Sequence, residues 1–214
     1  MIMVQADAPA KHLWRNPLPL VLASKSQARR DLLTATGLPF ECLDASIDER
    51  AVEDPLRRQG GQAADIAAHL ARAKALAIGA RRPDHLVIGA DQVLSLEGAL
   101  FSKPRDLDEA ADHLARFSGK THELHAALCV TRGGRVLFEG VPVARMRMRV
   151  LSPVFIKAYI EAAGTNALSS VGAYQLEHLG VHLFEEIEGD QSTILGLPLI
   201  PLLAFLRDEG SLLG

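Results

Sequence analysis

An acid and a lysine stand near each other in residues 89–104, which read Gly-Ala-Asp-Gln-Val-Leu-Ser-Leu-Glu-Gly-Ala-Leu-Phe-Ser-Lys-Pro. The apolar residues predict a strand that carries Asp91, followed by a return segment that ends at Lys103 beside a proline. A carboxylate can bind a divalent metal ion or accept a proton from water, and an ammonium group can neutralise a phosphate oxygen. The pair therefore indicates hydrolysis of a phosphoryl bond, although an Asp and a Lys at this distance also occur together by chance.

A second group of polar residues lies where a short apolar run, Leu18 to Ala23, gives way to a helical pattern. Unpaired backbone N–H groups and the helix dipole favour an anion at such a place. Ser24 and Ser26 add hydroxyls, and Arg29 can donate two parallel hydrogen bonds to a phosphate. Alternatively, Ser26 only caps the helix while Arg29 and Arg30 are solvated surface charges. Taken alone, the segment favours this second interpretation.

The segment Gly172-Ala173-Tyr174-Gln175-Leu176-Glu177 has two small residues followed by an aromatic, an amide and a carboxylate. Such a set could stack on a nucleobase and form hydrogen bonds with it. It could equally be a buried turn with Tyr174 in the core. A later segment, Gly189 to Pro198, is rich in capping groups, and its simpler role is to start the last helix.

Other candidate residues have structural interpretations. Lys74 lies one position off the apolar stripe of its helix, so its stem is expected to follow the core while its ammonium stays in water. The histidine pairs at 122 and 125 and at 178 and 182 are interpreted as structural rather than as metal ligands. Cys42 and Cys129 lack the spacing of a zinc site or a disulfide framework and are expected to be reduced core residues.

The strands and helices that carry these residues are predicted from the spacing of apolar residues and from the glycine and proline residues that end each element. Gly37 and Pro39 end the first helix, and Asp48-Glu49-Arg50 reads as a polar connection. In Arg145-Met146-Arg147-Met148-Arg149-Val150, strict alternation places guanidinium groups on one face of a strand and apolar groups on the other. The predicted strands are 18–23, 40–43, 85–96, 123–131, 136–140 and 145–150, and the predicted helices are 27–36, 62–79, 106–117, 153–163 and 197–209. This order predicts a mixed α/β fold with helices on the flanks of the sheet.

Composition limits the function classes. The 214 residues are 48% hydrophobic and 23% charged, as in a globular protein, and no stretch approaches the roughly 18 apolar residues of a membrane span. The formal net charge of -3 is spread along the chain, so no polymeric nucleic acid is expected as a partner. We find no signal segment among the first residues and therefore expect a cytoplasmic protein without a membrane partner.

Four segments occur together and in order: Leu22-Ala23-Ser24-Lys25-Ser26 with Arg29, Gly89-Ala90-Asp91-Gln92 with Ser102-Lys103-Pro104, Gly172-Ala173-Tyr174, and Gly189-Asp190 with Gly196-Leu197-Pro198-Leu199. In this combination the chain resembles the Maf family of nucleoside triphosphate pyrophosphatases. The resemblance implies a two-lobed α/β fold with a central cleft, similar to inosine triphosphate pyrophosphatases, and frequent assembly into homodimers. It also implies cleavage of a nucleoside triphosphate to the monophosphate and pyrophosphate with a divalent cation, Mg²⁺, Mn²⁺ or Co²⁺.

Through the same resemblance, Asp91 matches the family's proposed general base, Lys103 the lysine of its Gly-Lys-Pro element, and Arg29 the second arginine of its Ser-Pro-Arg-Arg element. We expect these three residues to be catalytic. Glu49 matches an acidic residue after the second strand, Lys74 a lysine on the following helix, and Glu177 a Gln/Glu position. We accordingly expect Glu49, Asp91 and Glu177 to bind the metal ion. The residues expected to bind substrate are Ser24, Ser26, Lys74, Gln92 and Glu177. The expected organisation is a flexible lead-in at 1–17, one catalytic domain of two lobes at 18–210, and a tail at 211–214.

The chain also departs from the family pattern. Gln27-Ala28 replaces Pro-Arg, and Ser102 replaces the glycine of Gly-Lys-Pro. Gln92 and Glu177 resemble the subgroup of 7-methyl-GTP pyrophosphatases, in which the carboxylate could pair with a positively charged methylated guanine. Three alternatives thus stay open: a 7-methyl-GTP-selective enzyme, a phosphatase that releases inorganic phosphate, and a nucleotide-binding regulator of cell division with little catalysis.

Overall fold

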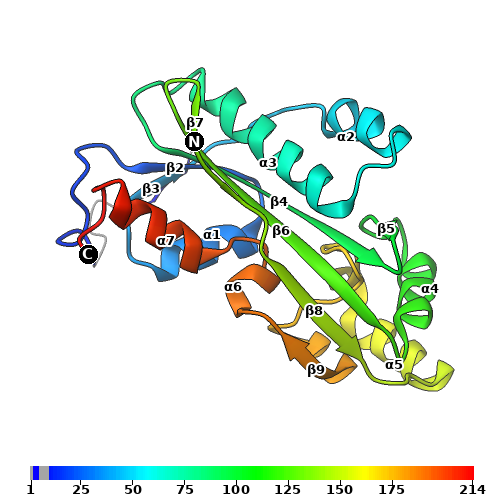
Figure 1. The fold of residues 1–214 in the computed structure, drawn as a ribbon. Coiled ribbons are helices and arrows are strands. Elements are labelled where there is room, and N and C mark those ends of the chain that lie inside the picture. Colours follow the sequence, from blue (N-terminus) through cyan, green and yellow to red (C-terminus); the bar gives the residue numbers. More distant parts are fainter. Residues whose placement is uncertain (1, 5–9) are drawn as a thin grey trace. The chain divides into compact units, whose positions relative to one another are not determined.

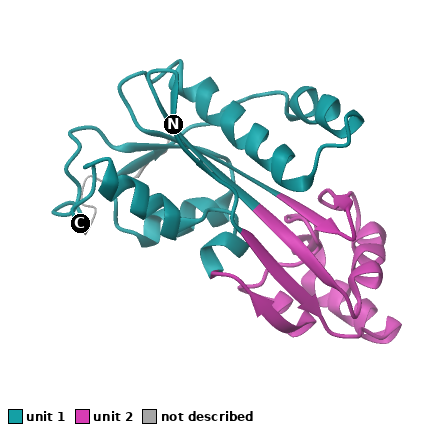
Figure 2. Cartoon of the chain, viewed as in Figure 1, with its two compact units in different colours: residues 1–92, 126–142, 191–214 teal, residues 93–125, 143–190 magenta. Residues whose placement is uncertain are grey.

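The computed structural model describes residues 2–4 and 10–214, which form two compact units (Figure 2). Unit 1 comprises residues 1–92, 126–142 and 191–214, and unit 2 comprises residues 93–125 and 143–190. Two long strands, β4 (Val87–Leu96) and β6 (Thr121–Arg132), contribute residues to both units. Figure 1 shows the fold and labels most of its helices and strands.

Unit 1 contains a mixed sheet. Strand β2 (Leu20–Ala23) pairs in parallel with both β3 (Phe40–Cys42) and β4, whereas β1 (Ile2–Val4) pairs antiparallel with β3. Strand β7 (Arg135–Gly140) pairs antiparallel with β6. All four residues of β2 are buried, as expected for a parallel strand covered on both faces. The predicted class, a mixed α/β fold with helices flanking a multi-stranded sheet, is confirmed.

Helices cover both faces of the parallel strands. Leu20 and Leu22 pack in one apolar cluster with Leu33 of α1 (Gln27–Ala35) and with Leu202 and Leu206 of α7 (Leu199–Asp208). The alternate residues of β2, Val21 and Ala23, pack with Ile78 of α3 (Ala63–Gly79) in a second cluster. The alternation of side chains along β2 therefore decides which helix each residue meets.

Local signals place the ends of α1 where the sequence predicts them. The Ser26 side chain accepts a hydrogen bond from the Arg29 backbone N–H, which is the expected N-cap contact. Past the other end of the helix, Gly37 adopts a φ of 68°, a left-handed conformation that glycine reaches without a steric penalty.

The polar connection predicted at Asp48-Glu49-Arg50 is wrong. These residues begin α2 (Glu49–Arg58), for which Asp48 is the N-cap. No residue of α2 is buried, and Pro55 stands inside it, so the sequence lacks the apolar stripe by which a helix is normally predicted. A second short helix, α6 (Gln191–Ile194), lies in the segment that was expected to be a loop before the last helix.

Unit 2 contains β5 (Ala99–Phe101), β8 (Val143–Met148) and β9 (Phe184–Glu188), with β8 between β6 and β9. Its helices are α4 (Leu107–Phe117), α5 (Pro153–Ala163) and the 3₁₀ turns η1 (Gly164–Leu168) and η2 (Leu179–Leu183). The predicted alternation in β8 is confirmed, because Met146 and Met148 are buried while Arg145 and Arg147 are exposed. Val150 is 82% exposed, contrary to the prediction, because β8 ends before it.

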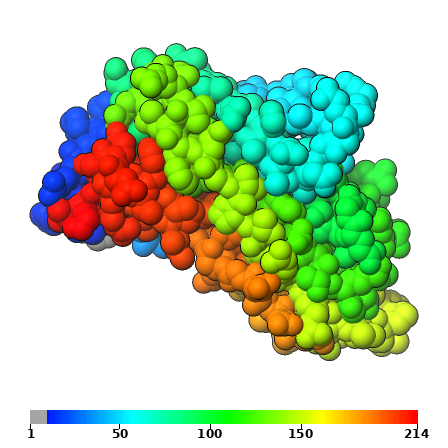
Figure 3. Space-filling view, viewed as in Figure 1, coloured from blue at the N-terminus to red at the C-terminus, as the bar shows by residue number. Residues whose placement is uncertain are grey.

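Residues near the two ends of the chain lie side by side in unit 1, where the blue and red regions of Figure 3 adjoin. Trp14 and Leu212 form an antiparallel bridge. Of the predicted lead-in at 1–17, residues 1 and 5–9 lie outside the described residues. Within the described parts of the chain, none of the helices has the length and apolar character needed to cross a membrane.

Candidate functional site

The candidate residues of unit 1 lie at one edge of its parallel strands. The β2 pairing with β4 ends at Ala23 opposite Gly89, and β3 runs parallel to β2 on its other side. The chain leaves β2 into Ser24, and Asp91 follows two residues after Gly89. Because parallel strands bring their carboxyl ends to the same edge, these residues lie where open α/β sheets bind ligands.

An ion cluster connects α2, α3 and β4 at this edge. The Lys74 ammonium lies 2.6 Å from Asp91 Oδ1 and 2.7 Å from Glu49 Oε1. Lys74 and Asp91 are buried, with 9% and 8% of their surfaces exposed, whereas the Glu49 side chain is 55% exposed. A buried ion pair is tolerated when each charge has a close partner, and here one ammonium serves two carboxylates.

The expectation that the Lys74 ammonium stays in water is therefore wrong. The buried stripe of α3 includes Lys74 itself, while its neighbours Ala73 and Ala77 are half-buried. The reason lies in β4. A Cβ atom on Gly89 would meet the Ala71 carbonyl oxygen at 2.1 Å, so the absence of a side chain lets α3 lie close against the strand and brings Lys74 to Asp91.

Arg29 lies close enough to this ion cluster for the two carboxylates to affect its pKa. Its Nε donates to the Gly196 carbonyl at 2.8 Å, and its Nη1 lies 3.5 Å from Ser24 Oγ. Burial lowers the pKa of the Arg29 guanidinium, and the negative charges of Asp91 and Glu49 oppose this effect. An arginine keeps its charge in such surroundings, so Arg29 is a fixed cation beside the carboxylates rather than a solvated surface charge.

Ser24 and Ser26 shape the loop that leads into α1. Ser24 Oγ accepts a hydrogen bond from the Ser26 backbone N–H at 3.2 Å, and Ser26 caps α1. The cap interpretation of Ser26 is thus confirmed. Their expected contacts with substrate stay predictions.

The segment around α6 supports the site in a way that the sequence did not reveal. Gln92 Nε2 donates to the carbonyl groups of Thr193 and Ile194 at 3.1 and 3.0 Å. Gly196 adopts a φ of 90° and places its carbonyl against Arg29. The amide of Gln92 therefore holds α6, and α6 in turn helps to hold Arg29. The two glycines, Gly189 and Gly196, were the available signal, although the segment indicated only a loop that starts the last helix.

Lys103 and Glu177 lie in unit 2. Lys103 is exposed just after β5, and Glu177 is exposed just before η2. Tyr174, by contrast, is only 4% exposed, so of the two interpretations the buried turn is confirmed and Tyr174 does not stack on a base. The catalytic and metal-binding roles of Lys103 and Glu177 stay predictions.

The cysteines lie in the core, as predicted, and His122 is fully buried while His125 is half-buried. His178 and His182 are exposed, so the structural interpretation of this pair stays a prediction. The two cysteines are buried and free, and burial raises the pKa of Cys129 to about 12. The described residues contain no group of three or more His, Cys, Asp or Glu side chains placed to hold a metal ion. Glu49 and Asp91 nevertheless fit Mg²⁺, which is often bound through one or two carboxylates and completed by water and substrate phosphates.

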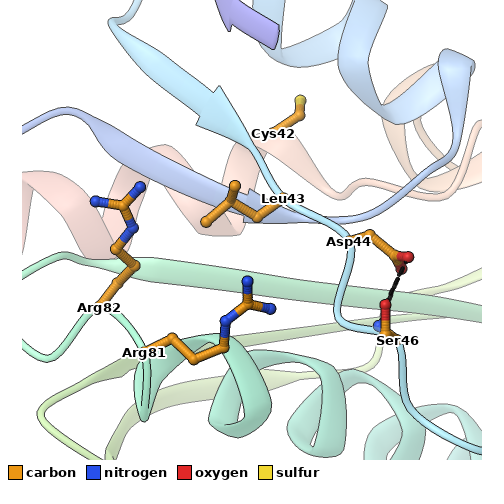
Figure 4. A pocket seen from close by; sticks show the side chains of 6 residues that line it. All are labelled: Cys42, Leu43, Asp44, Ser46, Arg81 and Arg82. Carbon is orange, nitrogen blue, oxygen red and sulfur yellow. Dashed lines mark hydrogen bonds between the residues drawn. The ribbon is translucent and has the colours of Figure 1, made fainter. Parts of the chain in front are cut away.

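A pocket of about 480 Å³ lies beside the segment that follows β3 (Figure 4). It is lined by Cys42, Leu43, Asp44, Ser46, Arg81 and Arg82. Asp44 pairs with Lys25 at 2.9 Å, and hydrogen bonds from Lys25 and Ser46 lower the pKa of Asp44 to about 2. Lys25 therefore binds a carboxylate next to this pocket, while its neighbours Ser24 and Ser26 contact Arg29.

Together, the parallel strands and the charged cluster at their carboxyl edge define an α/β protein with a site suited to a polyanion and a divalent cation. Comparison with known proteins shows the family. Residues 19–209 match the family model described as Maf-like protein, and the chain belongs to this family. The resemblance noted in the sequence is confirmed.

Curated relatives cover nearly the whole chain. The nucleoside triphosphate pyrophosphatase of Nitrobacter hamburgensis is 54% identical over 200 residues, which span 94% of this chain and 98% of that protein. A protein of the same name from Rhodopseudomonas palustris strain BisB5 is 52% identical over 92% of this chain and 96% of its own. The 7-methyl-GTP pyrophosphatase of Rhizobium etli is 51% identical over 91% of this chain and 98% of its own.

Proposed function

We propose that this protein hydrolyses a nucleoside triphosphate to the monophosphate and pyrophosphate with a divalent cation. The observation that carries the proposal is the cluster of Glu49, Lys74 and Asp91 beside Arg29, at the edge where parallel sheets bind ligands. The names of the relatives, which are pyrophosphatases of nucleoside triphosphates or of 7-methyl-GTP, support it.

The acidic and the basic residues of the site have different proposed roles. Asp91, oriented by the Lys74 ammonium at 2.6 Å, aligns a water molecule and accepts its proton during in-line attack on the α-phosphorus. Arg29 donates to the phosphates through its Nη groups, because its Nε is bound to Gly196. Lys103 adds positive charge for the departing pyrophosphate.

Glu49 and Asp91 supply oxygen ligands for the cation, and Glu177 is the third carboxylate proposed for it. When bound, the cation neutralises phosphate charge and lowers the pKa of a coordinated water. Because Lys74 pairs with both Glu49 and Asp91, it also limits the repulsion between these two carboxylates and the triphosphate.

A 7-methylguanosine triphosphate is the second candidate substrate. It is favoured by the exposed carboxylate of Glu177, which can pair with a cationic base, and by the Rhizobium etli relative. The cytoplasmic location and the homodimer stay predictions, which cell fractionation and light scattering would test.

The test is a panel of ordinary and methylated nucleoside triphosphates, assayed for pyrophosphate and for inorganic phosphate with Mg²⁺, Mn²⁺ and Co²⁺. We expect the release of pyrophosphate. Release of inorganic phosphate would instead indicate a phosphatase. Asp91→Asn should lower kcat about 100-fold or more. The exposed Asp84 provides a matched control, because Asp84→Asn makes the same change away from the cluster.

Two results would refute parts of the proposal. Near-normal turnover of Asp91→Asn with normal metal dependence would remove the base assignment. Tight triphosphate binding without turnover in the presence of metal would instead support the nucleotide-binding regulator.

A further inference from the structure

The segment from Gly172 to Gly180 makes a sharp turn whose first part is buried and whose last part is exposed. Gly172 and Ala173 both have positive φ, at 90° and 63°, and an alanine adopts this conformation only when its surroundings impose it. The backbone N–H groups of His178 and Gly180 both donate to the Gln175 carbonyl, at 3.1 and 3.0 Å. This turn presents Glu177, whose side chain is exposed.

Tyr174 connects the turn to the core of unit 2. Its hydroxyl lies 2.6 Å from Nε2 of His122, a residue of β6 that is 0% exposed. The His122 ring stacks on Phe117, and the Tyr174 ring meets Phe184 edge to face. Such aromatic packing holds the rings in the core, but only the hydrogen bond gives Tyr174 a directional contact with a strand.

The His122 ring depends on this contact. Its Nδ1 is buried and has no hydrogen-bond partner among the described residues, so Tyr174 provides the polar contact of Nε2 in an apolar surrounding. Burial lowers the pKa of His122 to about 4 and raises the pKa of Tyr174, so both groups stay neutral near pH 7. Leaving a buried polar atom without its hydrogen-bond partner destabilises the folded state. The hydrogen-bonded arrangement of His122 and Tyr174 is therefore favoured.

We propose that the hydrogen bond between His122 and Tyr174 fixes the turn that carries Glu177, which makes both residues positioning residues for substrate binding. The inference rests on the proposed function in the form in which the Glu177 carboxylate pairs with the base of the substrate. Two further contacts lie in this segment: the Ser170 hydroxyl donates to the Tyr174 carbonyl, and the Tyr159 hydroxyl lies 3.5 Å from the Ala173 carbonyl, at the limit of a hydrogen bond.

The test compares Tyr174→Phe with wild type in two measurements. Steady-state kinetics should show a KM for the triphosphate raised about 10-fold, with kcat within about twofold, because the reacting groups are untouched. Hydrogen exchange should show the amides of His178 and Gly180 exchanging at least about 10-fold faster, because the turn opens more often. Tyr159→Phe is the matched control, since it removes the hydroxyl of the other buried tyrosine and should change both values less than about twofold.

A double variant separates positioning from stability. Tyr174→Phe alone leaves His122 without a polar partner, whereas His122→Phe with Tyr174→Phe removes both polar groups and should recover most of the lost thermal stability. We expect the KM of the double variant to stay raised, because no hydrogen bond then joins the Tyr174 side chain to β6. Recovery of KM together with stability would show that packing alone positions the turn and would overturn the inference.

Unchanged KM and unchanged exchange at His178 and Gly180 in Tyr174→Phe would also overturn it. The exchange measurement needs no turnover. If wild type releases no pyrophosphate from any triphosphate, the proposed function fails, while the exchange data still decide whether the hydrogen bond fixes the turn.

Discussion

Removal of the Lys74 ammonium is expected to destabilise the fold more than removal of the Asp91 charge. In Lys74→Met, Asp91 keeps a carboxylate whose side chain is only 12% exposed, and its close partner is gone. In Asp91→Asn, Lys74 keeps Glu49 at 2.7 Å, and the asparagine oxygen can still accept from the ammonium. The two variants break the same ion pair but leave different groups unpaired.

The magnitudes follow from this difference. Breaking a buried pair by removing one partner costs about 3–5 kcal/mol, because an uncompensated charge stays buried. Replacing a charged acceptor with a neutral one of the same shape costs about 1 kcal/mol, in the range of an ordinary hydrogen bond. We therefore expect Lys74→Met to lower the free energy of unfolding by about 2–4 kcal/mol more than Asp91→Asn.

The assay is urea denaturation followed by circular dichroism at pH 7.5 in EDTA, so that bound metal does not contribute to stability. Arg72→Met is the control on the same helix. The Arg72 side chain is 47% exposed in its pair with Glu139, and an exposed pair contributes about 1 kcal/mol or less. The double variant of Lys74→Met with Asp91→Asn should be more stable than Lys74→Met alone, because it also removes the buried carboxylate that Lys74→Met leaves without its ammonium partner.

The reasoning would be refuted if Asp91→Asn destabilised the protein as much as Lys74→Met, or if Lys74→Met behaved like the Arg72 control. Either result would mean that water reaches Asp91 and replaces the ammonium.

Three further predictions concern packing, metal and pH. Gly89→Ala should lower the free energy of unfolding by at least about 2 kcal/mol and remove much of the activity, because its Cβ would meet the Ala71 carbonyl at 2.1 Å and force Lys74 away from Asp91. Urea denaturation measures the first effect and pyrophosphate release the second. Excess EDTA should abolish pyrophosphate release, and added Mg²⁺ or Mn²⁺ should restore it; full activity in EDTA would contradict the proposed metal. Burial lowers the pKa of His122 to about 4, below its unfolded value of about 6.5, so the unfolded state binds the proton first as pH falls. Stability should therefore decrease between about pH 6.5 and pH 4, by at most about 3 kcal/mol from this group, and a flatter pH dependence is expected for His122→Phe in urea denaturation.

Much of the fold could be predicted because its signals are local. The cap at Ser26 and the left-handed Gly37 bound α1, and α5 spans Pro153–Ala163 as predicted. Such signals depend on neighbouring residues in the chain. Helix α2 was not predicted because it buries none of its residues, so its sequence lacks the apolar periodicity that indicates a helix.

The sequence by itself determined the family, the class of fold and the residue types available for phosphate chemistry. Only the tertiary structure decided that Lys74 is buried between Asp91 and Glu49, and that Arg29 is held by the carbonyl of Gly196, 167 positions away. The physical reason is that both contacts join segments far apart in the chain; those of Lys74 depend on how closely α3 approaches β4, which the lack of a side chain at Gly89 allows. Periodicity along the chain indicates which face of a helix or strand is buried. It does not indicate which charged group lies on the neighbouring element that packs against this face.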